Sequence, residues 1–247
     1  MERLRPSHFR EKRFYRDWMK AEGLVRFDAR VLETDLAILA ERDLTCDALR
    51  NIVNLRNALQ KYADTHEGFL ATLEPVAADA DAPEIVKRMC AATSEWGVGP
   101  MASVAGAFAE MVGEALRAKS KEIIVENGGD IFIASKFPRD VGIFTGGKSP
   151  FSGRLTVQVR PESGIRGICT SSGTVGHSLS RGKADAVVTF AKSAAYADAA
   201  ATSIGNRVQT AADVETIIEE EKDRGNLLAL VIVIGDRMGA FGEIEFV

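Results

Sequence analysis

Apolar and polar positions along this chain follow two periods, which separate short predicted strands from a few longer helices. Short runs rich in β-branched and aromatic residues, bounded by turn residues, are typical of strands. These runs cover residues 11–19, 24–32, 35–40, 121–126, 130–135, 140–145, 154–160, 165–170, 185–191, 227–235 and 240–247. Many of the connections are rich in glycine, as hairpins need, so the strands are expected to pair mainly antiparallel.

Helical spacing of apolar side chains marks the longer segments between these strands. The predicted helices cover residues 47–65, a segment from Pro83 onward, and residues 101–118, 193–205 and 211–223. Pro83 suits a first helical turn, Ser193 is an N-cap residue type, and Gly205 is a residue type that ends helices. Residues 68–82 are expected to form a loop with room for one short strand. The sum is an α+β fold, a mainly antiparallel sheet with helices packed on it.

Length and charge narrow the classes of protein that this sequence can encode. The chain has 247 residues, enough for a buried core, and we expect one domain over 1–247. The formal net charge of −4 argues against a nucleic-acid binder, which would show a basic face. A basic run with interleaved aromatic residues near the N-terminus is interpreted as an edge strand with a solvated face rather than an RNA contact. Its basic residues are Arg3, Arg5, Arg10, Lys12, Arg13 and Arg16.

Cysteine usage and hydropathy point to a cytoplasmic protein. Cys46, Cys90 and Cys169 are widely separated and include no CxxC pair, so neither a zinc site nor a disulfide framework is indicated. A reducing compartment fits this pattern. No apolar signal region follows the N-terminus, and the longest apolar run, residues 227–234, has the length of a strand. We therefore expect no membrane partner.

The first glycine motif is Asn127-Gly128-Gly129-Asp130, between two predicted strands. Paired glycines of this kind favour a two-residue hairpin turn, which is the structural interpretation. The functional interpretation is that the glycines let backbone amides approach a ligand while the Asn127 side chain supplies directed hydrogen bonds. The motif alone supports both interpretations.

A second polar segment follows the strand predicted at 165–170. It reads Thr170-Ser171-Ser172-Gly173-Thr174, and His177 follows it. Successive amides and hydroxyls can form a concave site for anions, although a polar loop has the same composition. His177 is the one histidine near other site signals, and it is either a proton-transfer group or an ordinary surface residue.

The segment from Gly142 to Ser149 matches the P-loop spacing GxxxxGKS. A P-loop must open a helix directly after its Lys-Ser pair. Here Pro150 follows, and the next residues have the pattern of a strand. A glycine-rich hairpin with a solvated lysine is the preferred interpretation.

Asp198 and Thr202 lie four residues apart in the predicted helix that begins after Ser193. Side chains at this interval share one helix face, and the residues around them are mostly alanines, which let a ligand approach closely. A carboxylate and a hydroxyl on such a face suit a hard cation such as Mg²⁺, with phosphate oxygens completing its shell. The alternative is a solvated aspartate and a threonine bonded to its own backbone.

Taken together, these motifs resemble the ApbE-type FAD:protein FMN transferases. The resemblance covers roughly residues 97–247 and depends on the order of its parts. A helix bearing Gly106 comes first, and the Asn-Gly-Gly strand, the Thr-Ser-Ser-Gly loop and Ala197-Asp198-Ala199-Ala200-Ala201-Thr202 follow it. The resemblance implies an ApbE-like fold related to the T-fold, with FAD bound beside Mg²⁺. It assigns the metal to Asp198 and Thr202, together with a backbone carbonyl near Val104-Ala105.

The family's reaction moves FMN from FAD to a Ser or Thr hydroxyl of an acceptor protein and releases AMP. The residues here depart from the family at three places. The N-terminal segments with which the family contacts the flavin have no match in residues 1–96. A His-Ile-x-Asp-Pro segment is absent after the Thr-Ser-Ser-Gly loop, where His177 is the substitute, and Ala105-Gly106 stands where the family has Lys-Gly.

The leading hypothesis is therefore an ApbE-like protein that binds FAD or another pyrophosphate nucleotide with Mg²⁺, with FMN transfer to a protein left open as one reaction and a related chemistry on a different substrate as another. The ligand would contact Asn127, Gly128, Gly129, Asp130, the 170–174 loop and Gly106. The alternatives are a flavin- or nucleotide-binding protein without catalysis, an enzyme with a different substrate, and an oligomeric scaffold with a vestigial site. A homo-oligomer is compatible with the sequence.

Overall fold

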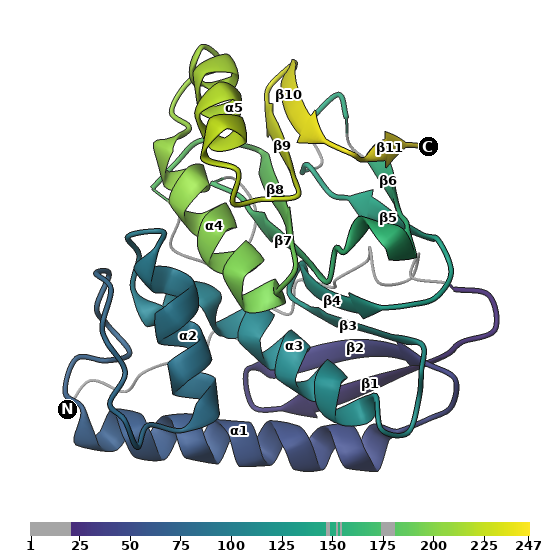
Figure 1. Ribbon diagram of the computed structural model, residues 1–247, viewed down its shortest axis with the longest axis vertical. Coiled ribbons are helices and arrows are strands. Elements are labelled where there is room, and N and C mark those ends of the chain that lie inside the picture. The colour runs from purple at the N-terminus through teal and green to yellow at the C-terminus, as the bar shows by residue number, and fades with distance from the viewer. Residues whose placement is uncertain (1–20, 147–148, 152, 154, 174–180) are drawn as a thin grey trace, which may run out of the picture.

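A large antiparallel sheet organises the computed structural model, which describes residues 21–146, 149–151, 153, 155–173 and 181–247 (Figure 1). Its strand order is β1-β2-β3-β4-β7-β8-β9-β10, so each strand lies beside its neighbours in sequence except where β5 and β6 leave the sheet. The strands are β1 (Val25–Val31), β2 (Thr34–Ala40), β3 (Ile123–Asn127), β4 (Asp130–Ala134), β7 (Gly167–Ser171), β8 (Ala186–Ala191), β9 (Ala229–Ile234) and β10 (Arg237–Gly242). Every neighbouring pair is antiparallel.

A second, smaller sheet covers part of one face of the large one. It contains β5 (Arg139–Ile143), β6 (Leu155–Val159) and β11 (Glu245–Phe246), in the order β11-β6-β5. The helices are α1 (Thr45–Thr65), α2 (Glu84–Ser94), α3 (Val104–Leu116), α4 (Ala194–Arg207) and α5 (Asp213–Arg224), with short 3-10 helices η2 (Pro100–Ser103) and η3 (Pro161–Ser163). The predicted α+β fold with a mainly antiparallel sheet is thus confirmed.

Burial on both faces of the large sheet explains why its central strands are almost wholly apolar. In β3, Ile123 and Val125 join the core beneath the helices, whereas Ile124 faces the small sheet. The same alternation holds in β8, where Val187 lies on the helix side and Val188 on the other. The molecule therefore has three layers, which are the helices, the large sheet and the small sheet (Figure 1).

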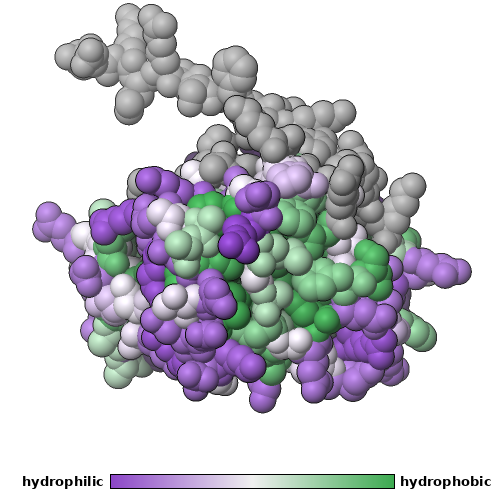
Figure 2. Space-filling view, turned by 90° about the horizontal axis from the view of Figure 1, so that it is seen from above, coloured by the Kyte–Doolittle hydropathy of each residue, from purple (hydrophilic) through white to green (hydrophobic). Residues whose placement is uncertain are grey.

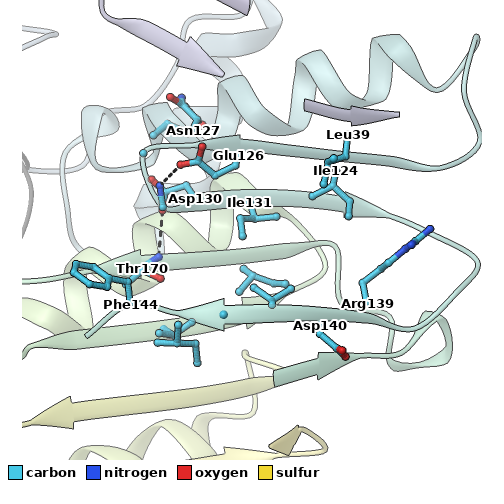
Figure 3. A pocket seen from close by; sticks show the side chains of 18 of the residues that line it. Leu39, Ile124, Glu126, Asn127, Asp130, Ile131, Arg139, Asp140, Phe144 and Thr170 are labelled. Atoms are coloured by element: carbon cyan, nitrogen blue, oxygen red, sulfur yellow. Dashed lines mark hydrogen bonds between the residues drawn. The ribbon is translucent and has the colours of Figure 1, made fainter. Parts of the chain in front are cut away.

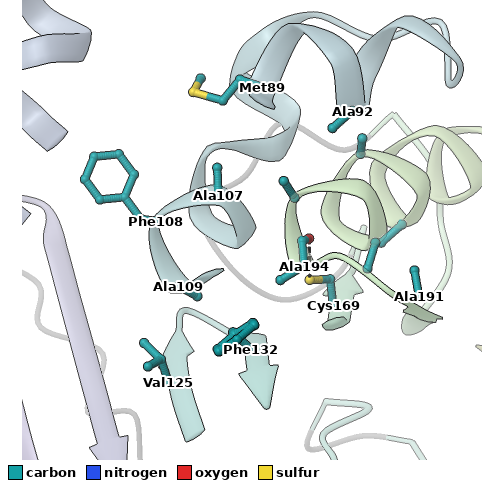
Figure 4. Packing of buried hydrophobic residues seen from close by; sticks show 14 of the residues in the cluster. Met89, Ala92, Ala107, Phe108, Ala109, Val125, Phe132, Cys169, Ala191 and Ala194 are labelled. Carbon is teal, nitrogen blue, oxygen red and sulfur yellow. Dashed lines mark hydrogen bonds between the residues drawn. The ribbon is translucent and has the colours of Figure 1, made fainter. Parts of the chain in front are cut away.

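Small residues let α3 and α4 pack closely on each other and on the sheet (Figure 4). A Cβ atom on Gly113 would come within 2.2 Å of the Phe132 ring, and one on Gly167 would come within 2.4 Å of the Ala194 Cα. The Cys169 thiol donates to the Ala194 carbonyl at 3.2 Å. Alanine and glycine at these positions are therefore set by tertiary contact, because bulkier side chains would separate the elements.

The start of α4 is capped from two directions. Ser193 accepts a hydrogen bond from the Tyr196 N–H at 3.3 Å, which confirms the predicted N-cap. The buried Glu110 of α3 accepts from the Ser193 hydroxyl at 2.7 Å and from the Ala195 N–H at 3.0 Å. A carboxylate at a helix N-terminus satisfies free N–H groups and complements the helix dipole, so this contact fixes α4 against α3.

Two predicted boundaries were wrong. Gly205 lies inside α4, which continues to Arg207, and its carbonyl would be 1.7 Å from a Cβ on Gly182. Position 182 must therefore lack a side chain to let this turn of α4 approach it, and the contact itself does not require glycine at 205. The strand predicted at 240–247 is divided between β10 and β11, because Gly242 has a φ of +106° and breaks the extended run. Residues 68–82 form a loop as predicted, without the short strand for which there was room.

The P-loop match and the first predicted strand are two further interpretations of the sequence. No helix occurs among the described residues between β5 and β6, and a strand follows, which confirms that the Gly142–Ser149 segment is not a P-loop. The strand predicted at 11–19 lies outside the described residues.

The surface in Figure 2 carries hydrophilic side chains around most of its periphery, with hydrophobic residues exposed between them. Within the ranges that the structure describes, no helix combines the length and the apolar character that crossing a bilayer requires.

A His–Asp–Tyr cluster fastens the 66–82 loop to the end of α1. The His66 Nε2 lies 2.7 Å from an Asp79 carboxylate oxygen, which also accepts from the Tyr62 hydroxyl at 3.1 Å. The Tyr62 and His66 rings stack with centroids 3.7 Å apart. The Tyr62 carbonyl, and then the Asp79 carboxylate, raise the pKa of His66 above its ordinary value.

This cluster predicts that the loop loosens as the pH rises. A histidine whose pKa is raised by folding stabilises the folded state fully below its unfolded pKa of about 6.5, and that contribution is lost as the pH passes its folded pKa. We expect amides in residues 68–82 to lose protection between pH 6 and pH 8, measured by hydrogen exchange corrected for the intrinsic rate. His66→Gln should abolish this pH dependence. A wild-type loop with equal protection at both pH values would contradict the prediction.

Candidate functional site

A pocket of about 1190 Å³ is bounded by strands of both sheets and by residues of η2, α3 and α4. Its apolar wall comes from the face of the large sheet that is turned away from the helices (Figure 3). That wall includes Leu39, Ile124, Ile131, Ile168 and Val188. A wall of this kind suits a flat, largely apolar part of a ligand, because ligand pockets are mostly apolar with a few placed polar groups.

The polar end of the pocket begins at the hairpin between β3 and β4. Asn127 pairs with Asp130 across the turn, and the two residues between them have positive φ angles of +71° for Gly128 and +106° for Gly129. Such angles are strained for side chains other than glycine, which explains the residue types. The hairpin turn predicted from sequence is therefore present, and it lines the pocket.

Side chains of the hairpin hold this end in place. The Asn127 amide donates to the Ala105 carbonyl of α3 at 3.1 Å, and the Gly129 N–H donates to the Glu126 carboxylate at 2.8 Å. The Asp130 carboxylate accepts from the Thr170 N–H at 3.3 Å, which joins β4 to β7 (Figure 3). These bonds fix the position of three elements around one cavity.

Asp198 lies in α4 and reaches across to the start of α3. One of its carboxylate oxygens accepts from the Gly106 N–H at 2.8 Å. A Cβ on Gly106 would lie 2.3 Å from the Ala194 carbonyl oxygen and 2.8 Å from the Asp198 Cβ, so only glycine permits this approach. Thr202 follows one turn later and also lines the pocket, where its hydroxyl makes no hydrogen bond to any described residue.

Electrostatics at this end favour a bound cation. Burial, followed by the nearby Asp130 carboxylate, raises the pKa of Asp198 well above its ordinary value, although N–H groups of Gly106 and Ala105 act in the opposite direction. None of the groups that act on this pKa is a cation. Two carboxylates in a partly buried site are costly to ionise without a counter-charge. A cation would remove that cost.

The donor set determines which cation fits. Asp198 and Thr202 offer a carboxylate and a hydroxyl, and Asp130 adds a second carboxylate nearby. In the part of the chain that the structure describes, no group of three or more His, Cys, Asp or Glu side chains forms a complete metal site. These oxygen donors are too few to complete a coordination shell. Such an incomplete set is suited to Mg²⁺, which keeps waters and ligand phosphates as its other ligands. The residues therefore fit Mg²⁺ and not zinc.

Most residues predicted for the site line this pocket. They are Asn127, Gly128, Gly129, Asp130, Thr170, Ser171, Ser172, Asp198 and Thr202. Gly106 lies behind Asp198 and acts through its N–H. Gly173 does not line the pocket. Its N–H donates to the Ala184 carbonyl at 2.9 Å, and its lack of a side chain allows the close approach of the Gly182 carbonyl. Thr174 and His177 lie outside the described residues.

The other end of the pocket was not predicted from the sequence. There, the Glu122 carboxylate accepts from the Ser135 hydroxyl at 2.6 Å and from the Arg139 guanidinium at 3.3 Å. Burial raises the pKa of Glu122, but hydrogen bonds from Ser135, the Lys136 N–H and Arg139 outweigh it and leave that pKa below its ordinary value. Phe137 and Arg139 both line the pocket, with the guanidinium 5.8 Å from the ring centroid. No motif or spacing in the sequence brings these residues together.

Comparisons with known proteins agree with this geometry. A family model described as AbpE bacteria matches residues 16–233. A UPF0280 protein of Methanocella arvoryzae is 40% identical over 215 residues, which cover 87% of each chain. A UPF0280 protein of Methanococcus vannielii is 43% identical over 203 residues, which cover 80% of this chain and 81% of the relative.

Solved structures agree in fold at low sequence identity. The ApbE protein of Thermotoga maritima has a TM-score of 0.58 at 13% identity and covers 89% of this chain and 97% of its own. The flavinyl transferase ApbE of Pseudomonas stutzeri has a TM-score of 0.54 at 14% identity and covers 88% of this chain and 93% of its own. The predicted resemblance to ApbE proteins is thereby confirmed for the fold and the family.

Proposed function

This chain belongs to the AbpE bacteria family, and we propose that its pocket binds FAD or a related pyrophosphate nucleotide together with Mg²⁺. One observation carries the proposal. The Asp198 carboxylate, the Thr202 hydroxyl and the Gly128-Gly129 turn line the same cavity of about 1190 Å³. Structural neighbours named as a flavinyl transferase and a flavin transferase support a flavin as the ligand.

Asp198 and Thr202 would hold the cation, which when bound supplies positive charge against phosphate oxygens. The surrounding residues prepare this end of the pocket. The Gly106 N–H orients the Asp198 carboxylate, and the Asn127 amide orients the Ala105 carbonyl. Groups that are held in place by such contacts lose little further freedom when a ligand binds.

The remaining parts of the pocket suit the rest of such a ligand. The turn at Gly128 and Gly129 has no side chains, so phosphate or ribose groups can approach its backbone. The apolar wall that includes Ile124, Ile168 and Val188 can cover one face of a flat ring and exclude water from it.

The reaction implied by the family is transfer of FMN from FAD to a Ser or Thr hydroxyl of an acceptor protein. The hydroxyl oxygen would form a bond to the FMN phosphorus, the bond from that phosphorus to the AMP oxygen would break, and the hydroxyl proton would pass to a base. His177 is the proposed base on sequence grounds, and it lies outside the described residues.

A second function, ligand binding without transfer, is favoured by one observation in the sequence. After His177 the chain reads Ser178-Leu179-Ser180-Arg181-Gly182, so the Asp-Pro segment of the transferases is absent. Under this second function the protein would bind the same nucleotide and release no AMP.

Thr202→Val tests the proposal, because it removes the hydroxyl and keeps the side-chain shape. We expect wild-type protein to bind FAD more tightly with Mg²⁺ than with EDTA, measured by flavin fluorescence. The variant should lose about tenfold in affinity with Mg²⁺ and little in EDTA, as the loss of one metal ligand predicts. Ser203→Ala is the matched control, since that hydroxyl donates to the Trp96 carbonyl at 2.7 Å.

Two results separate the outcomes. FAD binding that is indifferent to Mg²⁺, or equal losses in Thr202→Val and Ser203→Ala, would contradict the cation site. If binding depends on Mg²⁺, release of AMP in the presence of acceptor proteins distinguishes transfer from binding alone.

A further inference from the structure

A second hollow lies at the opposite end of α3 from Asp198. It has a volume of about 590 Å³, and four of its seven lining residues are cations, namely Arg117, Lys121, Lys136 and Arg166. Two alanines and Ser135 complete the lining, so no acidic residue is part of it. These cations come from separate places, since Arg117 follows α3, Lys121 precedes β3, Lys136 follows β4 and Arg166 precedes β7.

The side chains of these four residues form no ion pair or hydrogen bond with any described residue. Two neighbouring carboxylates accept hydrogen bonds from groups other than these four side chains. Glu122 binds Arg139, and Glu41 accepts from the Lys121 backbone N–H at 2.7 Å. Other arginines of this acidic chain, such as Arg88 and Arg207, are paired with glutamates. A local excess of unpaired positive charge is therefore a property of this hollow and not of the composition.

Two ordinary explanations for clustered cations account for little of this excess of positive charge. Cations complement the dipole at a helix C-terminus, but only Arg117 follows α3 directly. Carbonyls near the end of that helix already accept backbone hydrogen bonds, because Gly113 accepts from the Arg117 N–H at 3.1 Å and Leu116 from the Lys119 N–H at 2.9 Å. Lysines also protect exposed edge strands, but β3, β4 and β7 are interior strands of the large sheet.

We propose that this hollow binds a small anion with two or more linked phosphoryl groups. Convergent like charges repel one another, and a multiply charged anion replaces that repulsion with attraction. Guanidinium and ammonium groups are the side chains that bind phosphate oxygens most strongly. The volume is in the range of small-molecule sites, and the site is separate from the Asp198 pocket.

The test titrates inorganic triphosphate into the full-length protein by calorimetry in EDTA and low salt. EDTA removes the divalent cation that the Asp198 pocket requires for a phosphate ligand, so the two sites are measured apart. We expect wild-type protein to bind one equivalent. Lys121→Gln combined with Lys136→Gln should weaken binding at least about tenfold, as loss of two phosphate contacts predicts. Both side chains are exposed, so folding should be preserved.

Lys61→Gln combined with Lys222→Gln is the matched control, because it removes the same charge from exposed lysines that line neither pocket. The control should remain within about twofold of wild type. Affinity should fall from triphosphate to pyrophosphate to orthophosphate, and with added salt. An equal loss in the control, no binding by wild type, or loss of this metal-free binding in Asp198→Asn would overturn the proposal.

Discussion

Gly106→Ala is expected to destabilise the protein, although alanine is the better helix former. Helix propensity alone predicts a gain of about 1 kcal/mol for this change inside α3. The added Cβ would meet the Ala194 carbonyl oxygen at 2.3 Å and the Asp198 Cβ at 2.8 Å. Backbone atoms of α4 cannot give way as a flexible side chain could. We expect a net loss of about 2 kcal/mol in the free energy of unfolding, measured by urea denaturation.

Gly142→Ala is the control for this change. Gly142 lies in β5, has no positive φ, and a Cβ there would meet nothing within 4 Å. The free energy of unfolding of the Gly142→Ala protein should differ from that of wild type by less than about 0.5 kcal/mol. A Gly106→Ala protein more stable than wild type would show that α3 and α4 do not make the close contact on which the geometry of Asp198 depends.

The layout of the sheet could be predicted because local patterns specify it. In β3 and β8 almost every side chain is buried, and short apolar runs between turn residues mark such strands. The Gly128-Gly129 hairpin was predicted because its backbone angles require glycine. The prediction was wrong at Gly205, because α4 continues through it to Arg207. Gly182 shows a constraint that no local pattern reveals, since a Cβ there would meet the carbonyl of Gly205, which is distant in sequence.

The site was predictable to the extent that it uses local motifs. Asp198 and Thr202 share a helix face, so their common direction follows from spacing. The apolar wall was not predictable, because Leu39, Ile124 and Val188 meet only once β2, β3 and β8 lie in one sheet. The Glu122–Arg139 contact joins a residue just before β3 to one in β5, seventeen positions apart, and nothing in either segment indicates a partner.

Asp198→Asn is expected to abolish stabilisation by the ligand while leaving the protein without ligand at least as stable as wild type. Asparagine keeps an oxygen that can accept from the Gly106 N–H, which now binds at 2.8 Å. It also removes a half-buried carboxylate beside Asp130, whose ionised form that environment disfavours. An ordinary structural aspartate would show the opposite, a loss of stability without ligand.

The measurement is thermal unfolding in EDTA and again with Mg²⁺ and saturating FAD. A ligand at one hundred times its Kd stabilises the folded state by about 2.7 kcal/mol, which raises the melting temperature of a chain of this size by roughly 5–10 °C. We expect this rise in wild type and in Asp236→Asn, which removes an exposed carboxylate from the turn after β9. Asp198→Asn should show no rise that depends on Mg²⁺. If the rise persists in Asp198→Asn, the cation is held elsewhere, because no other residue of α4 except Thr202 offers this end of the pocket an oxygen ligand.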